Sequence, residues 1–426
     1  MQKVKQFVLD GSQRGYPADL ASVAASEIGS LGLNPRDGSA QLPVLTFDRS
    51  AWNRNCDAMF AYCAAVGARI APHAKTPMSP ELAKELINRG AVAMTVADIR
   101  QAAVMLEHGI DHLLLANQIG GTSSGARLGR LLAQYPSAKL TLYVDSVAAL
   151  ETAAAVADAA GRRLDFLIEV GGGRAGARGL DVVRAIFVRL SDLPNLRASG
   201  IAAYEGASVT ADATATRRDI AAVHALASEA FALLRSRQPG ERLILSSGGS
   251  SFFDLVLDDL GPVAQADGNC DILLRSGAIF FSDHGIYAKR LLDMDHRSGF
   301  EPARLGAASN AFVPALLVHA EVLSRPEPGL VICGMGMRDV SFDQGLPVPI
   351  AGWRAGRDLA LPQDVTVTKL NDQHAFLKLP AKADLAVGDV VSFGISHPCT
   401  ALDRWSWMLE TAPDGKIIGA LRTHFG

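Results

Sequence analysis

The sequence predicts an α/β protein in which an N-terminal (β/α)8 barrel of the TIM type is followed by a mostly β domain. Two observations lead to this prediction. From about residue 52, short apolar runs alternate with longer Ala- and Leu-rich stretches of helical spacing, the pattern of βαβ units and a parallel sheet. After about residue 300, short apolar runs such as GLVICGMGM and DVVSFGIS are separated by Pro and Gly, which is typical of closely spaced strands.

Eight apolar runs are expected to be the barrel strands. They lie at Arg69–Pro72, Val92–Val96, His112–Ala116, Lys139–Asp145, Leu164–Val170, Arg197–Tyr204, Arg242–Ser246 and Asp271–Leu274. The helical stretches between them include Pro80–Asn88, Ile99–Glu107, Ala148–Ala160 and Arg217–Leu234. Eight repeats over about 230 residues suit a closed barrel, and an open doubly wound sheet is the alternative.

Three parts of the chain are expected from this change of pattern. Residues 1–51 form an N-terminal segment, residues 52–300 the barrel and residues 301–426 the β domain. The run LPVLTFD, from Leu42 to Asp48, reads as a strand that joins the sheet of the β domain.

Composition excludes several classes of protein. The 426 residues are 49% hydrophobic and 20% charged, which excludes a disordered or fibrous chain. The net charge of −3 leaves no electrostatic footprint for nucleic acid or an anionic membrane. We see no transmembrane run and no secretory signal, and the five cysteines contain no CxxC pair. We therefore expect a reduced, cytoplasmic protein.

The first candidate site is RIAPHAKT, in which His73 and Lys75 follow the first barrel strand. The carboxyl end of barrel strands is the active-site face. A desolvated lysine there can lose its proton and form a Schiff base, although most lysines are solvated surface residues.

The second site is SSGGSS, residues 246–251, which follows the seventh strand. Two glycines let the backbone approach an anion, and barrels often bind phosphate after their seventh and eighth strands. A plain Gly-Gly turn is the alternative. A strand-end lysine together with a phosphate loop suggests pyridoxal phosphate.

Two further motifs follow other strands. EVGGGRAGAR, residues 169–178, is a weak match to a dinucleotide fingerprint, and its Arg174 is either a solvated turn residue or a partner for an anionic group. In SHPCTALDRW, residues 396–405, His397 and Cys399 are spaced to face the same side and are both of zinc-binding type. Alone, such an HxC pair is most often accidental.

Together these motifs resemble a known family. PHAKT, the YEG at Tyr204–Gly206, SSGGSS, LRSGAIFFSD, GMGMRDVSFDQGLP and SHPCTALDRW occur in the order typical of the fold-type III pyridoxal phosphate enzymes of the D-serine dehydratase and D-threonine aldolase group, which are relatives of alanine racemase. The resemblance runs from about Leu42 to about Trp405. Cys399 points to the zinc-dependent D-serine dehydratase branch, because the aldolases usually carry His-x-Asp at that place.

The resemblance implies a role for each matched residue. Lys75 matches the Schiff-base lysine, with His73 beside it, and Tyr204 and Arg174 match residues beside the cofactor ring. The phosphate would be held by Ser247, Gly248, Gly249 and Ser250, with Gly277 and Ala278 adding backbone donors. His397 and Cys399 match the ligands of a zinc ion. The resemblance also implies a homodimer, a small D-amino acid as substrate, and no nucleic-acid or membrane partner.

The expected reaction is the β-elimination of D-serine to pyruvate and ammonia. Lys75 would abstract the α-proton, and zinc would assist departure of the hydroxyl as a Lewis acid. The main alternative is retro-aldol cleavage of a β-hydroxy-D-amino acid such as D-threonine to glycine and an aldehyde, with His73 or His374 as base. Racemisation, a pyridoxal phosphate carrier and a barrel enzyme without that cofactor are the others.

Overall fold

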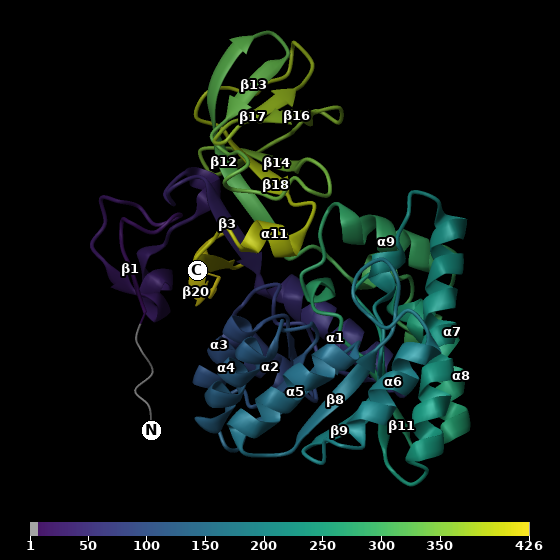
Figure 1. The fold of residues 1–426 in the computed structure, drawn as a ribbon. Helices are drawn as coiled ribbons and strands as arrows, with labels where there is room; N and C mark the ends of the chain where they lie inside the picture. Colours follow the sequence, from purple (N-terminus) through teal and green to yellow (C-terminus); the bar gives the residue numbers. More distant parts are fainter. Residues whose placement is uncertain (1–6, 426) are drawn as a thin grey trace.

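Parallel strands form a curled sheet in the first part of the chain, and an antiparallel domain follows above it (Figure 1). This architecture comes from a computed structural model, which describes residues 7–425. The alternation of apolar runs and helical stretches is thus realised as a parallel α/β barrel with a C-terminal antiparallel domain, and the predicted fold class is confirmed.

The barrel sheet has eight strands within the described residues, in the order β4-β11-β10-β9-β8-β7-β6-β5. Backbone hydrogen bonds close the path between its two ends: Thr95 N–H donates to the Pro72 carbonyl at 2.8 Å, and Ala74 N–H donates to the Thr95 carbonyl at 2.8 Å. The strands are β4 (Arg69–Ile70), β5 (Met94–Val96), β6 (His112–Leu115), β7 (Lys139–Val144), β8 (Leu164–Glu169), β9 (Leu196–Ala202), β10 (Leu243–Ser246) and β11 (Cys270–Leu274).

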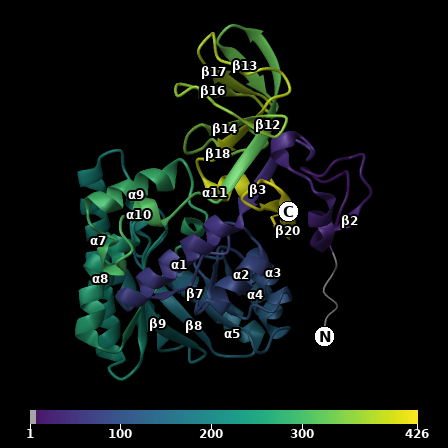
Figure 2. The same cartoon turned by 180° about the vertical axis from the view of Figure 1, so that it is seen from behind.

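Helices surround this sheet, as Figures 1 and 2 show from the front and the back. They are α1 (Arg49–Ala65), α2 (Pro80–Asn88), α3 (Ile99–Glu107), α4 (Thr122–Ala133), α5 (Val147–Ala160), α6 (Leu180–Leu190), α7 (Ala213–Arg237), α8 (Phe253–Asp267) and α9 (Ile286–His296). The Asp48, Asp98 and Asp212 side chains cap three of them by accepting backbone N–H groups. A Cβ on Gly125 would lie 2.5 Å from the Thr152 carbonyl oxygen, so glycine allows α4 and α5 to pack closely.

Each strand and helix expected from the barrel pattern is present at or within two residues of its expected bounds at nearly every end. The helices α2 and α3 have the predicted bounds. The predicted strands end later than the observed ones at the loops after β4 and β9, because the chain turns into the cleft there.

The antiparallel domain is built around the long strand β12 (Leu316–Glu327), which pairs with β3, β13 and β18. The run expected as a strand at Leu42–Asp48 is β3 (Val44–Asp48), which also pairs with β19 and so joins this sheet. The other strands and short helices are β13 (Leu330–Cys333), β14 (Val348–Arg354), β15 (Arg357–Leu359), β16 (Thr366–Leu370), β17 (Ala375–Lys378), β18 (Val390–Gly394), β19 (Trp407–Thr411), β20 (Ile417–Arg422), α10 (Ala308–Ala311) and α11 (Pro398–Leu402).

The N-terminal segment lies against the β domain through β1 (Val8–Leu9) and β2 (Val23–Ala24) and two 3₁₀ helices, Ala25–Leu31 and Pro35–Asp37. Its Arg14 contacts two segments that are far apart in the sequence, residues 338–339 and residues 404–405. The guanidinium lies 4.4 Å from the Trp405 ring centroid, pairs with the buried Asp339 carboxylate, and donates to the carbonyls of Arg338 and Arg404 at 3.1 Å. The segment therefore fixes two of the motifs that the resemblance rests on.

Two expectations from composition can be compared with the described residues. None of the helices in residues 7–425 is both long and apolar enough to cross a membrane. All five cysteines are unpaired, and Cys56 and Cys63 are buried on α1.

Candidate active site

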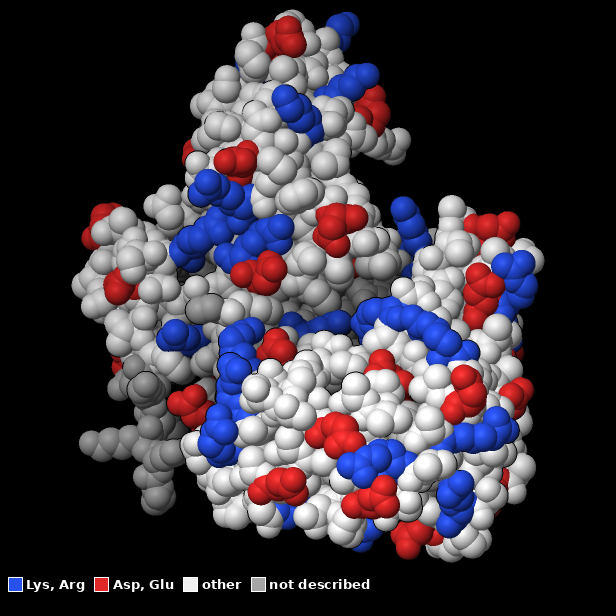
Figure 3. Space-filling view, viewed as in Figure 1, with Lys and Arg blue, Asp and Glu red and all other residues white. Residues whose placement is uncertain are grey.

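A cleft of about 800 Å³ lies where the carboxyl ends of the barrel strands meet the β domain. Figure 3 shows Lys and Arg side chains along the hollow between the two parts. Arg174, Lys289 and Arg290 are among the residues that line it. The cleft also brings together most of the site residues predicted from the sequence, which are His73, Lys75, Arg174, Tyr204, Gly248, Gly249, Ser250, Gly277, Ala278, His397 and Cys399.

The loop after β4 presents Lys75 to this cleft. The Lys75 side chain is exposed within the lining, two residues after His73, whose backbone is held by the neighbouring strands. Burial lowers the pKa of His73 well below its ordinary value, and the charges of Lys75 and Arg275 lower it further. His73 is therefore a neutral imidazole near pH 7 and is able to accept a proton.

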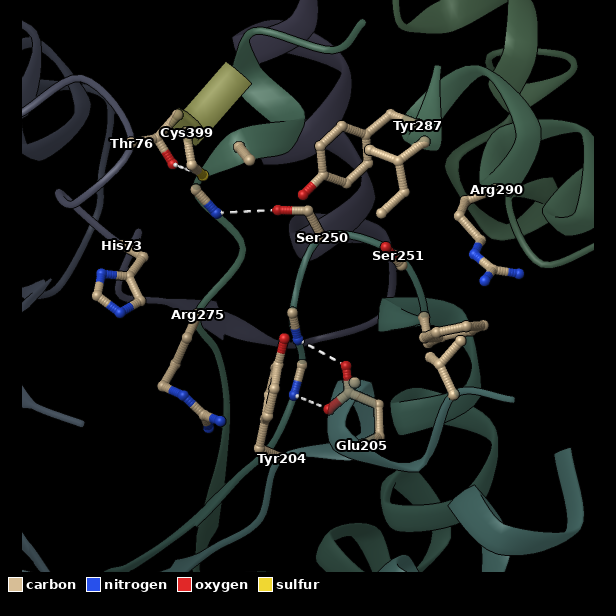
Figure 4. A pocket seen from close by; sticks show the side chains of 18 of the residues that line it. His73, Thr76, Tyr204, Glu205, Ser250, Ser251, Arg275, Tyr287, Arg290 and Cys399 are labelled. Atoms are coloured by element: carbon tan, nitrogen blue, oxygen red, sulfur yellow. Dashed lines mark hydrogen bonds between the residues drawn. The ribbon is translucent and has the colours of Figure 1, made fainter. Parts of the chain in front are cut away.

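Ser250 also lines the cleft, in the loop between β10 and α8 (Figure 4). Its hydroxyl accepts the backbone N–H groups of Gly277 at 3.2 Å and Ile279 at 3.1 Å. The Tyr287 hydroxyl points toward it, and Ser251 follows at the amino end of the helix (Figure 4). Hydroxyls and the start of a helix form a suitable cradle for a phosphate group.

The glycine loop itself does not offer all its donors to the cleft, contrary to the sequence-based expectation. The Ser247 hydroxyl and the Gly248 and Gly249 N–H groups donate to the Glu205 carboxylate at 2.9, 2.9 and 2.6 Å (Figure 4). Ser247 is fully buried and does not line the cleft. The cleft-facing donors are therefore those of Ser250 and the residues after it.

Tyr204 and Arg174 lie together at the rim. The Arg174 guanidinium lies 4.7 Å from the Tyr204 ring centroid, and its side chain is 53% exposed. Burial raises the pKa of the Tyr204 hydroxyl, so it is a neutral phenol near pH 7. Arg174 belongs to the loop after β8, whose glycines carry it outward.

A different arginine occupies the floor of the cleft. Arg275, from the loop after β11, is buried and donates to the Ser246 hydroxyl and the Ala203 carbonyl, both at 2.6 Å. Its guanidinium lies 5.6 Å from the Tyr143 ring centroid and makes no salt bridge with an acidic side chain of the described residues. Burial raises the pKa of Tyr143 to about 12. A buried cation without a carboxylate partner favours an electron-rich or anionic ligand.

His397 and Cys399 reach the cleft from the β domain. His397 is the N-cap of α11, and its Nδ1 lies 2.7 Å from an Asp343 carboxylate oxygen. The other Asp343 oxygen accepts the Thr400 hydroxyl at 2.6 Å, and the Cys399 Sγ lies 3.3 Å from the Thr76 hydroxyl (Figure 4). The β domain thus places a sulfur beside the lysine loop.

The charges of this pair depend on each other. Burial opposes the charge of His397, but Cys399 and Asp343 outweigh it and raise the pKa of His397 to about 9. Burial likewise acts to raise the pKa of the Cys399 thiol, but the hydrogen bond and charge of His397, together with Lys75, lower it below its ordinary value. A thiol whose pKa is lowered in this way gives up its proton more readily, which suits a metal ligand.

Close backbone contacts hold this wall against the barrel. A Cβ on Gly285 would lie 2.6 Å from the Ser396 Cα, and His284 N–H donates to the Ile395 carbonyl at 2.9 Å. The residues just before His397 are therefore fixed to the loop that precedes α9.

Residues 7–425 contain no cluster of three or more His, Cys, Asp or Glu side chains arranged to hold a metal. An ion bound by His397 and Cys399 would thus need further ligands from water, substrate or cofactor.

The sequence reasoning missed four residues of the site, which are Glu205, Arg275, Tyr287 and Asp343. Three of them lie inside motifs already singled out: Glu205 in YEG, Arg275 in LRSGAIFFSD and Asp343 in GMGMRDVSFDQGLP. These three residues are visible in the sequence motifs, but their roles depend on partners in other loops, which the sequence does not reveal.

Two family profiles match the chain. The profile described as "Alanine racemase, N-terminal domain" matches residues 47–254, and the one described as "Putative serine dehydratase domain" matches residues 315–411. Among characterised relatives, the D-threonine aldolase of Arthrobacter sp is 26% identical over 358 residues, which is 83% of this chain and 85% of the relative. The 3-hydroxy-D-aspartate aldolase of Paracoccus denitrificans is 27% identical over 353 residues, 80% of this chain and 81% of the relative.

Solved structures show the same fold. The D-threonine aldolase from Filomicrobium marinum has a TM-score of 0.69 at 21% identity and covers 91% of this chain and 96% of its own. The D-threo-3-hydroxyaspartate dehydratase from Delftia sp. HT23 has a TM-score of 0.69 at 23% identity, with 91% and 98% covered.

Proposed function

Because the chain belongs to the alanine racemase-like group of fold-type III pyridoxal phosphate enzymes that contains D-threonine aldolase and D-serine dehydratase, we propose that it is a zinc-assisted β-hydroxy-D-amino acid dehydratase acting on D-serine. The dehydratase assignment rests on the pair His397 and Cys399. Both side chains line the same cleft as Lys75, and Asp343 holds the His397 ring.

Pyridoxal phosphate is the cofactor expected for this family, and the residues present fit it. We propose that Lys75 binds its aldehyde and that Ser250 and Ala278 hold its phosphate, with Gly277, whose N–H donates to the Ser250 hydroxyl, beside them. For the ring nitrogen we propose the buried Arg275 rather than the exposed Arg174. When bound, the cofactor supplies an electron sink for the carbanion at Cα.

The zinc proposal rests on the donor set. A thiolate and an imidazole favour zinc over magnesium or manganese. Asp343 fixes the His397 ring in one orientation, as carboxylates do for metal-binding histidines. A cysteine-to-alanine variant of D-threo-3-hydroxyaspartate dehydratase has been described in a metal-free form. When bound, the ion supplies a Lewis acid for the β-hydroxyl.

The chain's own residues then divide the work. Lys75 takes the α-proton of the substrate, since its amine is the base that lies in the cleft after β4. Tyr204 and His73 line the same cleft as neutral groups, because burial raises the pKa of the Tyr204 hydroxyl and lowers that of His73, and the hydrogen bond with His397 lowers the pKa of the Cys399 thiol. Electron flow from Cα to Cβ releases the hydroxyl, and the product hydrolyses to a keto acid and ammonia.

Retro-aldol cleavage is the second candidate, because the relatives at 26% and 27% identity are named aldolases. It needs a base for the β-hydroxyl proton. His374 is exposed in the turn between β16 and β17 and does not line the cleft, so His73 is the base available to this reaction. We also propose a homodimer, which light scattering tests.

The test is to incubate the purified protein, pyridoxal phosphate and zinc with D-threonine and identify the products. We expect 2-oxobutanoate and ammonia in equal amounts, and no reaction with L-threonine. Glycine and acetaldehyde would instead establish the aldolase. The Lys75→Ala variant is the control for both outcomes.

A further inference from the structure

A buried chain of polar side chains lies behind the glycine loop and has no part in the chemistry above. It begins at Glu205, which is 0% exposed and accepts hydrogen bonds from Ser247, Gly248 and Gly249. Since these three donors are buried, they would lack partners without the carboxylate, and each such loss is costly.

The chain continues behind Ser247. The His224 Nε2 lies 3.4 Å from the Ser247 hydroxyl, and its Nδ1 lies 2.7 Å from an Asp259 carboxylate oxygen. Asp259 also accepts the Arg217 guanidinium at 2.7 and 3.0 Å. The side chains thus form a continuous path from the surface, between α7 and α8, to the loop.

The directions of the hydrogen bonds follow from the donors available. The Ser247 hydroxyl has one proton, which it donates to Glu205, and the His224 Nε2 lies 3.4 Å from its oxygen. Burial acts to raise the pKa of Asp259, but the hydrogen bonds from His224 and Arg217 lower it, so it is a carboxylate that accepts. Each ring nitrogen of His224 thus lies beside a side-chain oxygen, and the ring is held from two sides.

Ser247, His224 and Asp259 have the composition of a hydrolytic triad, but the geometry excludes that role. Ser247 is 0% and His224 1% exposed, and none of the three lines the cleft. The Ser247 proton is also committed to Glu205 rather than to the histidine.

The loop has a backbone conformation that glycine adopts readily and that leaves no room for a side chain. Gly248 has a φ of +103°, in the left-handed region, and a Cβ there would lie 2.9 Å from a Leu274 methyl carbon. Two residues later, Ser250 faces the cleft and accepts from Gly277 and Ile279. A shift of the Gly248–Gly249 backbone would move Ser250 with it.

We propose that Glu205 and His224 are positioning residues that hold residues 247–250 in the conformation in which Ser250 binds the cofactor phosphate. This inference rests on the proposed pyridoxal phosphate site. It assigns a function to a buried histidine that does not line the cleft, and to a buried acid at the cleft wall whose carboxylate oxygens already accept the three loop donors. These buried polar side chains therefore affect binding of the phosphate group of the cofactor and leave the position of Lys75 unchanged.

The test compares two ligands that differ in the phosphate alone. Apoprotein is titrated with pyridoxal phosphate and with pyridoxal, and the visible absorbance gives both dissociation constants. In Glu205→Gln, whose amide N–H₂ would face the loop donors, and in His224→Gln, we expect the constant for pyridoxal phosphate to rise about tenfold or more. We expect the constant for pyridoxal to change less than about twofold, and kcat at saturating pyridoxal phosphate to stay within about threefold.

His319→Gln is the matched control. His319 is also buried and also held by two side chains, Thr46 at 2.9 Å and Ser392 at 2.8 Å, but it lies in the β domain. Equal losses for both ligands, or losses no larger than those of His319→Gln, would overturn the proposal. If His224→Gln does not fold, Asp259→Asn at the outer end of the chain replaces it, with the same selective loss expected. Wild-type protein that binds neither ligand would overturn the proposed function, and the positioning role with it.

Discussion

Two histidine–aspartate pairs of the same length serve the two sides of the cleft. In both, the Nδ1 lies 2.7 Å from a carboxylate oxygen: His224 with Asp259 on the barrel, and His397 with Asp343 in the β domain. They differ in what the other nitrogen meets. His224 is buried and faces a serine hydroxyl, whereas the His397 side chain is 20% exposed and faces a thiol at the cleft.

The comparison shows that the position of a histidine–aspartate pair in the fold determines whether the histidine supports other protein groups or binds a ligand. A carboxylate fixes the orientation of an imidazole in either place. Behind the glycine loop the fixed ring can support only other protein groups, because it is buried and does not line the cleft. At the cleft the fixed ring is free to bind a ligand, and its neighbour Cys399 is the soft donor that zinc favours.

The barrel side is tested most strongly at Lys75. We expect Lys75→Ala to lose more than about a thousandfold in turnover, because the covalent link to the cofactor and the base at Cα are lost together. The visible absorbance of the bound cofactor should shift to that of free pyridoxal phosphate. Lys289→Ala, which removes another cleft lysine, is the control. Normal turnover in Lys75→Ala would contradict the site assignment.

The β-domain side is tested by Cys399→Ala. We expect it to retain the cofactor absorbance and to lose metal-dependent turnover by about 10²- to 10³-fold, since a Lewis acid is worth several kcal/mol. Cys270→Ala, at a cysteine on β11, is the control and should behave as wild type. If a chelator and Cys399→Ala both leave turnover intact, no metal takes part.

The two pairs can be compared directly through their carboxylates. We expect Asp343→Asn to weaken zinc binding by about 10- to 100-fold, because the His397 ring loses its fixed orientation. Asp259→Asn should leave zinc binding unchanged. Zinc affinity is measured by competition with a fluorescent chelator. Equal effects of the two substitutions on zinc affinity would show that the two histidine–aspartate pairs do not differ in metal binding.

A smaller effect is expected in the dependence of stability on pH. One oxygen of Asp283 accepts the N–H groups of Gly285 and Tyr287 at 2.8 Å, and the other is buried without a partner among the described residues. Burial raises the pKa of Asp283 to about 7, against the hydrogen bonds that lower it.

The folded protein therefore binds a proton at Asp283 that the unfolded chain releases near pH 4. This stabilisation is lost as the pH rises through 7. Between pH 6 and 8 the free energy of unfolding should fall by roughly 1 kcal/mol more in wild type than in Asp283→Asn. Urea denaturation at both pH values measures it. Equal slopes in the two proteins would show that Asp283 does not titrate there.

The barrel could be predicted from the sequence because its strands and helices follow one another locally, and each carries its own periodicity. The register of the β domain could not, because β3 pairs with β12 across more than 260 residues. The apolar run at Leu42–Asp48 indicated a strand but not its neighbours.

The site shows the same division. Lys75, His397 and Cys399 could be predicted as site residues because each has a distinctive chemistry at a strand end, and all three line the cleft. The assignment of Ser247 and Gly248 to the phosphate missed Glu205, because the acid that takes their hydrogen bonds comes from the loop after another strand. Which of Arg174 and Arg275 faces the ring nitrogen of the cofactor depends on which loop reaches the floor of the cleft. The spacing of glycines in the sequence does not predict how deeply a loop lies.

The pairing of β3 has a consequence for synthesis of the chain. Its Val44, Leu45 and Phe47 are fully buried in the finished protein, but their partners on β12 begin at Leu316. At 5–20 residues per second, a ribosome needs on the order of 15 to 50 s to make the intervening chain. Throughout that time the barrel residues are being made, and the apolar strand at their amino end has no partner on β12. The nascent chain therefore exposes this strand until β12 is synthesised, and of the predicted site residues His397 and Cys399 are the last to be made.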